Sequence, residues 1–218
     1  MKPDPIVFLQ KILSRIKIDK SIRNYICQKE LVYQVSQINK ELTQQVEEFR
    51  NRPLENTYPV IWVDALYEKI RDNHRVCNMA VHVVCGVNLD GTREILTVEP
   101  MYEESEASYT ALFDSLKKRG LQNVWLAVPD AHPGLIAAIQ KSFISCSWQR
   151  CKVHFMRNIL AHIPAKDKES FAAKLKQIWQ QPDYESAKRY AELLVEEYET
   201  RFSKAVEVLE NGLEDSLQ

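Results

Sequence analysis

The sequence predicts an α/β fold built on a mixed sheet, with helical segments before and after it. Three observations support this prediction. Short runs rich in β-forming residues follow one another between residues 58 and 98. Two further apolar stretches then alternate with helical patterns up to about residue 162. The segments on both sides of this region carry apolar residues at helical spacing. We therefore expect one α/β domain with helical extensions in the 218-residue chain.

Composition fits a soluble globular protein, with 45% hydrophobic and 27% charged residues. No apolar run reaches the roughly 18 residues of a membrane span, and residues 1–19 lack a signal-peptide pattern. We therefore expect a location in the cytoplasm or nucleoid and no membrane partner. The five cysteines are widely spaced and form no CxxC pair, so we expect reduced thiols, mostly buried in strands. They are Cys27, Cys77, Cys85, Cys146 and Cys151.

The first element is predicted to be a helix over Glu30–Phe49, where Leu31, Ile38 and Val46 belong to an apolar stripe at helical spacing. The pattern ends at Asn51-Arg52-Pro53, a helix stop. Residues 1–29 fit no clear element, and a degraded helix pair is one interpretation.

Three strands are predicted next. The first, Tyr58–Val63, ends at Asp64. Val76–Val87 is the second, and the turn Asn88–Gly91 leads into the third, Arg93–Val98, because glycine tolerates the positive φ of a tight hairpin. The three strands are expected to be antiparallel neighbours.

Helices and strands then alternate. Ser105 is expected to cap a helix that ends at Gly120. The elements expected after it are a buried strand Val124–Val128 that ends at Pro129-Asp130, a helix Pro133–Phe143, a short strand Ser147–Cys151 and a helix Val153–His162. Beyond Pro164 two apolar stripes predict helices only.

This order of three antiparallel strands followed by a βαβα crossover is the ribonuclease-H-like order. Right-handed crossovers would place the fourth strand beside the first. The carboxyl ends of those two strands would then be neighbours, which brings Asp64 and Asp130 together. Phosphodiester chemistry with two metal ions needs carboxylates that hold the ions roughly 3.5–4 Å apart. The alternative is that each aspartate is a loop residue, or that Asp130 caps the helix starting near Pro133.

A second group of candidate residues follows the short strand. Cys151 and His154 form a CxxH pattern, whose side chains would share one helical turn. Zinc binding is one interpretation, but a zinc site needs about four ligands and no convincing second pair is present, although His132, which closely follows Asp130, could approach. A structural role for Cys151 and His154 is the alternative. The stretch from Ser147 to Lys168 is locally basic, and its bases Arg150, Lys152 and Arg157 are candidates for contacting phosphates. A solvated helix face is the alternative interpretation.

Several ordered blocks resemble the Mutator-type bacterial insertion-sequence transposases, over roughly Leu31–Gln218. The blocks are Asn51–Leu54, Trp62–Arg71, Gly86–Glu94, Val128–Leu135 and Trp148–Asn158. The resemblance implies a ribonuclease-H-like fold and a DDE triad of metal-binding acids, with Asp64 and Asp130 on its first two positions. It also implies that Cys151 and His154 lie close to the active site.

The resemblance further implies metal-dependent strand cleavage and transfer at insertion-sequence ends, using Mg²⁺ or Mn²⁺. The expected partners are double-stranded DNA, as terminal inverted repeats and target, and further copies of the chain. The expected organisation is a partial helical DNA-binding segment (1–57), a partial catalytic core (58–163) and the start of an all-α insertion (164–218).

The family's third acid is a glutamate on a helix beyond the insertion, and no late glutamate here lies in a matching motif. Those late glutamates are Glu192, Glu196, Glu197, Glu207 and Glu210. The alternative function is therefore a catalytically inactive, truncated remnant that binds DNA or interferes with full-length subunits. A simple ribonuclease-H-like nuclease is a third interpretation.

Overall fold

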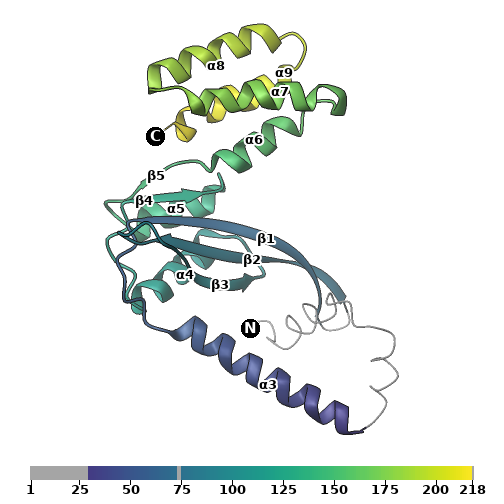
Figure 1. The fold of residues 1–218 in the computed structure, drawn as a ribbon, viewed down its shortest axis with the longest axis vertical. Coiled ribbons are helices and arrows are strands. Elements are labelled where there is room, and N and C mark those ends of the chain that lie inside the picture. The colour runs from purple at the N-terminus through teal and green to yellow at the C-terminus, as the bar shows by residue number, and fades with distance from the viewer. Residues whose placement is uncertain (1–28, 73–74, 218) are drawn as a thin grey trace.

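The computed structural model describes residues 29–72 and 75–217, so Cys27 and the interpretation of residues 1–28 lie outside the described residues. The described chain forms a five-stranded mixed sheet with helices on one face and at both ends (Figure 1). The strands are β1 (Val60–Asp72), β2 (Arg75–Val87), β3 (Arg93–Met101), β4 (Leu126–Pro129) and β5 (Ser147–Trp148). The α-helices are α3 (Lys29–Asn51), α4 (Glu106–Lys118), α5 (Pro133–Ser142), α6 (Lys152–Leu160), α7 (Ala165–Gln177), α8 (Tyr184–Tyr198) and α9 (Ser203–Gly212), with 3₁₀ turns η1 (Ile178–Gln180) and η2 (Glu214–Ser216).

The strand order is β3-β2-β1-β4-β5. The first three strands pair antiparallel, and β4 pairs parallel with both β1 and β5. The prediction of a mixed sheet with the fourth strand beside the first is confirmed. The sheet therefore brings residues 64 and 130 to the same region, although they are far apart along the chain.

The predicted end of the first strand was wrong. β1 does not stop at Asp64 but continues to Asp72, because it pairs with β2 over its whole length. The charged residues after Asp64 interrupt the apolar pattern that predicts a strand. Here the hydrogen bonds to β2, rather than burial, keep the backbone of β1 extended. What ends near Asp64 is the pairing of β1 with β4, whose last pair is Val63 with Pro129.

One face of the sheet carries the main core. Helices α4 and α5 pack there with Tyr109, Phe113 and Ile139 against Ile61 and Val63 of β1, all of them buried. The predicted cap of α4 is confirmed, since Ser105 Oγ accepts a hydrogen bond from the Ser108 amide at 3.2 Å. Because side chains alternate along a strand, Asp64, which follows Val63, lies on the opposite face of β1.

The end of α4 ties the helix to the segment before β1. Gly120 has φ +114°, a conformation that favours glycine, as the predicted helix stop requires. An added Cβ there would lie 2.7 Å from the Leu54 carbonyl oxygen. The Leu54 amide in turn donates to the Arg119 carbonyl at 2.7 Å. This bond fixes where the chain enters the first strand.

The first and last parts of the described chain are helical, as predicted. Helix α3 extends away from the sheet, and the helices after Pro164 stack beyond β5 (Figure 1). We call α7, η1, α8, α9 and η2 the helical unit. It has a second core, in which the ring of Phe171 lies edge-on to Tyr198 and Phe202, at centroid distances of 5.0 and 5.8 Å. Within the described part of the chain, no helix has the length and apolar character to cross a membrane.

A core substitution tests the packing of the helical unit. Phe171 is 1% exposed, whereas Leu193 on the outer side of α8 is 57% exposed. We expect Phe171→Ala to lower the free energy of unfolding by about 3–5 kcal/mol, because it removes a buried aromatic ring. The control Leu193→Ala should change it by no more than about 0.5 kcal/mol. Chemical denaturation measures both, and equal stability of the two variants would contradict the described core.

Candidate active site

Two carboxylates meet where β1 and β4 stop pairing. Asp64 follows Val63 and Asp130 follows Pro129, and these two preceding residues are parallel partners. Neighbouring strands lie about 4.8 Å apart, so the backbones of the two aspartates begin as neighbours. Both aspartates line one pocket of about 220 Å³. We call it the carboxylate pocket.

The hydrogen bonds of the two aspartates are alike. Oδ1 of Asp64 accepts the amide of Ala65, and Oδ1 of Asp130 accepts the amide of Ala131, both at 2.8 Å. Asp130 does not cap α5, because the N-cap is His132 and no side chain makes a capping bond there. The capping alternative for Asp130 is therefore wrong.

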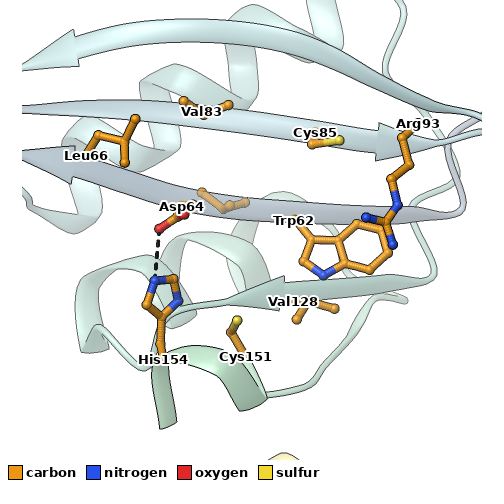
Figure 2. A pocket seen from close by; sticks show the side chains of 10 residues that line it. Trp62, Asp64, Leu66, Val83, Cys85, Arg93, Val128, Cys151 and His154 are labelled. Carbon is orange, nitrogen blue, oxygen red and sulfur yellow. Dashed lines mark ion pairs between the residues drawn. The ribbon is translucent and has the colours of Figure 1, made fainter. Parts of the chain in front are cut away.

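His154 lies against the first aspartate. Its Nε2 is 3.3 Å from Oδ1 of Asp64, and Figure 2 shows the ring approaching the carboxylate from α6. Cys151 is the N-cap residue of α6, so the CxxH pattern spans the first turn of that helix. With Trp62, Val128 and Asp64, both residues line a second, mostly apolar pocket of about 340 Å³ (Figure 2).

The donor atoms of the site suit Mg²⁺ better than zinc. Among residues 29–72 and 75–217, no group of three or more histidine, cysteine or acidic side chains is arranged to hold a metal ion. A zinc site needs about four such ligands. Mg²⁺ keeps several waters and is bound through one or two carboxylates together with substrate phosphates. The pair Asp64 and Asp130 fits that requirement.

A hydrogen-bond network that the sequence analysis missed forms another wall of the carboxylate pocket. Glu104 accepts hydrogen bonds from the hydroxyls of Tyr67 and Tyr109, the latter at 2.7 Å. Its Oε1 lies 3.8 Å from Nε2 of His82, which is buried in the sheet. All four side chains line the carboxylate pocket. The sequence offered only the residue types of these four side chains as a signal. That signal was insufficient, because polar residues in strand or capping segments also occur far from functional sites.

Charges in this network are set by burial and by the two tyrosines. Burial alone would raise the pKa of Glu104, but the hydrogen bonds from Tyr67 and Tyr109 outweigh it, and the pKa lies below 4.5. The bond to Glu104, followed by burial, raises the pKa of Tyr67 to about 12. Burial lowers the pKa of His82. At neutral pH the wall therefore holds an ionised glutamate beside an uncharged imidazole.

Histidines also surround the pocket. His132 lines it beside Asp130, as the sequence analysis allowed, and its ring centroid lies 5.7 Å from that of Tyr109. Both ring nitrogens of His82, and Nδ1 of His132 and of His154, are buried without a hydrogen-bond partner in the described chain. The pocket thus combines carboxylate acceptors with imidazole nitrogens that can accept or donate.

The three basic candidates differ in their surroundings. Lys152 and Arg157 are exposed on α6, and Arg157 lines the carboxylate pocket. Arg150 is only partly exposed, with its guanidinium carbon 4.2 Å from the ring centroid of Phe155. Burial lowers the pKa of Arg150, although Asp130 and Asp215 oppose this. Lys152 and Arg157 are therefore better placed than Arg150 to meet a phosphate. None of the five late glutamates lines either pocket.

Paired carboxylates at neighbouring strands, beside exposed bases on a helix, are the features of a phosphodiester-processing site. The comparisons with known proteins agree with this class. A family described as "Transposase, Mutator family" matches residues 9–218. The chain belongs to the Mutator family of transposases, as its motifs predicted.

Curated relatives carry related names. The transposase for insertion sequence element IS256 in transposon Tn4001 of Staphylococcus aureus is 41% identical over 187 residues, covering 84% of this chain and 48% of that protein. The transposase for element ISRM5 of Rhizobium meliloti is 35% identical, covering 84% and 46%. The transposase for element IS1081 of Mycobacterium tuberculosis is 40% identical over 154 residues, covering 70% and 37%. The chain spans about half the length, or less, of these relatives.

A solved structure shows only weak similarity. It is a simian T-cell lymphotropic virus intasome in complex with PP2A regulatory subunit B56 gamma, with a TM-score of 0.31 and 11% identity, covering 61% of this chain and 52% of that one. This similarity is too low to bear on the fold.

The Glu104 network makes stability depend on pH. Because the folded-state pKa of Glu104 lies below its ordinary value of 4.5, its contribution is present above that value and is lost as the pH falls through the folded pKa. At pH 7 we expect Glu104→Gln to lower the free energy of unfolding by about 1–3 kcal/mol. The difference from the parent should shrink below pH 4.5. Urea denaturation at several pH values measures it, and a constant difference would contradict the ionised network.

Proposed function

We propose that residues 58–163 are the ribonuclease-H-like catalytic core of a DNA transposase that cleaves DNA strands at element ends and joins them to target DNA. The single observation that carries this proposal is the placement of Asp64 and Asp130 on neighbouring strands, in one pocket. Family membership and the observed strand order support it.

We assign Asp64 and Asp130 as the residues that hold the divalent cations, Mg²⁺ or Mn²⁺. Bound there, such ions would activate the attacking oxygen and stabilise the leaving oxygen of an in-line displacement. The chain's own contribution is rigid presentation of the carboxylates. Asp64 lies inside a long strand, and each carboxylate is oriented by a bond to its neighbouring amide. His154, 3.3 Å from Asp64, restrains that carboxylate further.

The proposed substrate is double-stranded DNA, namely the terminal inverted repeats of an element and its target, and the proposed assembly is a homo-oligomer. Lys152 and Arg157 on the exposed side of α6 are the proposed phosphate contacts. Arg157 lines the carboxylate pocket and would hold a backbone phosphate near Asp64 and Asp130, and Lys152 would contact the DNA backbone from the first turn of the same helix. We propose residues 1–57 as a partial DNA-binding segment and residues 164–218 as part of a helical insertion. The remnant alternative is not favoured, because the matched relatives are named as insertion-sequence transposases.

Neutralising a carboxylate tests the catalytic assignment. We expect Asp64→Asn and Asp130→Asn each to reduce Mg²⁺-dependent strand cleavage by at least about 100-fold, because an amide cannot replace the charge that holds the cations. The affinity for the same DNA should stay within about threefold, since neither residue supplies positive charge. A gel assay with labelled element ends measures cleavage, and a filter or anisotropy assay measures affinity. Asp114→Asn, an exposed change on α4, is the control. Parent-like cleavage by the Asp64 variant would refute the proposal.

Salt dependence tests the proposed phosphate contacts. We expect Lys152→Ala and Arg157→Ala each to weaken DNA binding and to reduce the slope of log affinity against log salt by about one. Lys118→Ala, an exposed change at the far end of α4, should leave both quantities unchanged. Titrations at several salt concentrations measure the slopes. Slopes equal to that of the parent would show that these bases do not meet phosphates.

A further inference from the structure

The end of the helical unit lies against the segment that leads into α6. The Arg150 amide donates to the Asp215 carbonyl at 2.7 Å, and the Gln149 side-chain amide donates to the Ser216 carbonyl at 3.1 Å. Ser216 Oγ also accepts the indole N–H of Trp179 at 3.2 Å. The turn after α9 is therefore bonded both to this segment and to the rest of the helical unit.

The other side of the same segment is bonded to the sheet. The amides of Gln149 and Cys151 donate to the carbonyls of Ala127 and Pro129 in β4, both at 2.9 Å. Residues 149–151 thus continue the edge of the sheet beyond β5, up to the residue before Asp130. An exposed sheet edge offers unpaired backbone groups, and here the end of the helical unit covers it.

The Arg150 side chain lies between α6 and the end of α9. Its guanidinium carbon lies 4.2 Å from the ring centroid of Phe155 on α6. Nε of Arg150 is buried without a hydrogen-bond partner in the described chain. A planar guanidinium on an aromatic ring is held by stacking as well as by charge, which a lysine ammonium cannot reproduce.

Gly212 permits this packing. A Cβ at position 212 would lie 2.0 Å from Nη1 of Arg150 and 2.7 Å from Cε2 of Phe155. Any larger residue must displace the arginine, the ring or α9 itself.

We propose that Arg150 and Gly212 are positioning residues that clamp the first turn of α6 and thereby set His154 against Asp64. Phe155, which Arg150 and Gly212 both contact, is the residue after His154. Fixing the Phe155 ring and the Arg150 backbone therefore fixes the imidazole that lies 3.3 Å from the Asp64 carboxylate. The clamp makes the helical unit part of the site's framework. In this proposal Arg150 has a packing role in place of the expected phosphate contact. The proposal rests on the proposed catalytic role of Asp64.

The test compares Arg150→Lys and Gly212→Val with Asn211→Val, which introduces the same residue at the exposed neighbouring position. Arg150→Lys keeps the charge but not the stacking. We expect both clamp variants to lower the single-turnover cleavage rate at saturating DNA by about 10- to 100-fold, since small misplacements of a site have that cost. DNA affinity and its salt dependence should not change. Hydrogen exchange at the amides of Arg150 and Phe155, measured without DNA, should become faster. The Asn211 variant should match the parent in all these measurements.

Two results would overturn the clamp. Unchanged exchange at both amides in Gly212→Val would show that α9 does not hold α6. Parent-like cleavage by Arg150→Lys, combined with weaker DNA binding and a lower salt slope in Arg150→Met, would identify Arg150 as a phosphate contact. Gly212→Ala serves if the valine variant does not fold, because it adds only the Cβ that approaches Arg150 and Phe155, and it should show the same changes at smaller size. If the parent cleaves no DNA, the proposed function fails, whereas the exchange measurements still decide the clamp.

Discussion

The parallel pairing of β1 with β4 determines where the candidate site can form. Its last pair, Val63 with Pro129, places the next residue of each strand side by side, and both are aspartates. β1 then continues beyond β4 because its ladder with β2 persists to Asp72. Asp64 therefore stands on a strand that is hydrogen-bonded on one side, while Asp130 begins the turn into α5. A shift of this register by one residue would send one carboxylate to the other face of the sheet.

Two structural supports converge on this pair of carboxylates. Behind the pocket, Glu104 joins the strand residue Tyr67 to the helix residue Tyr109 and so ties β1 to α4. Beside it, α6 brings His154 to Asp64 and is itself held by the helical unit. The site is thus supported by β1, α4, α6 and the helical unit. This arrangement links the separate helical core to the proposed catalytic residues on the sheet.

Much of the fold could be predicted from the sequence, because turn and cap residues such as Ser105 and Gly120 act locally. The extension of β1 could not, since its strand conformation comes from the partner strand. The same limit applies to function. The positions of Asp64 and Asp130 follow from strand order, but the environment of Arg150 depends on a glycine about sixty residues later. The packing of Arg150 is the basis for proposing a positioning role in place of the predicted phosphate contact. Glu104 was missed because nothing local distinguishes it from a solvated glutamate.

The central claim is that the two carboxylates hold divalent cations together. Iron-mediated cleavage of the polypeptide tests this directly, because Fe²⁺ bound at a magnesium site generates radicals that cut the nearby backbone. With peroxide and a reductant, we expect cuts confined to short stretches around Asp64 and Asp130, both suppressed by excess Mg²⁺ and both lost in Asp130→Ala. Cuts at only one aspartate, or a pattern unchanged by that substitution, would contradict a shared site.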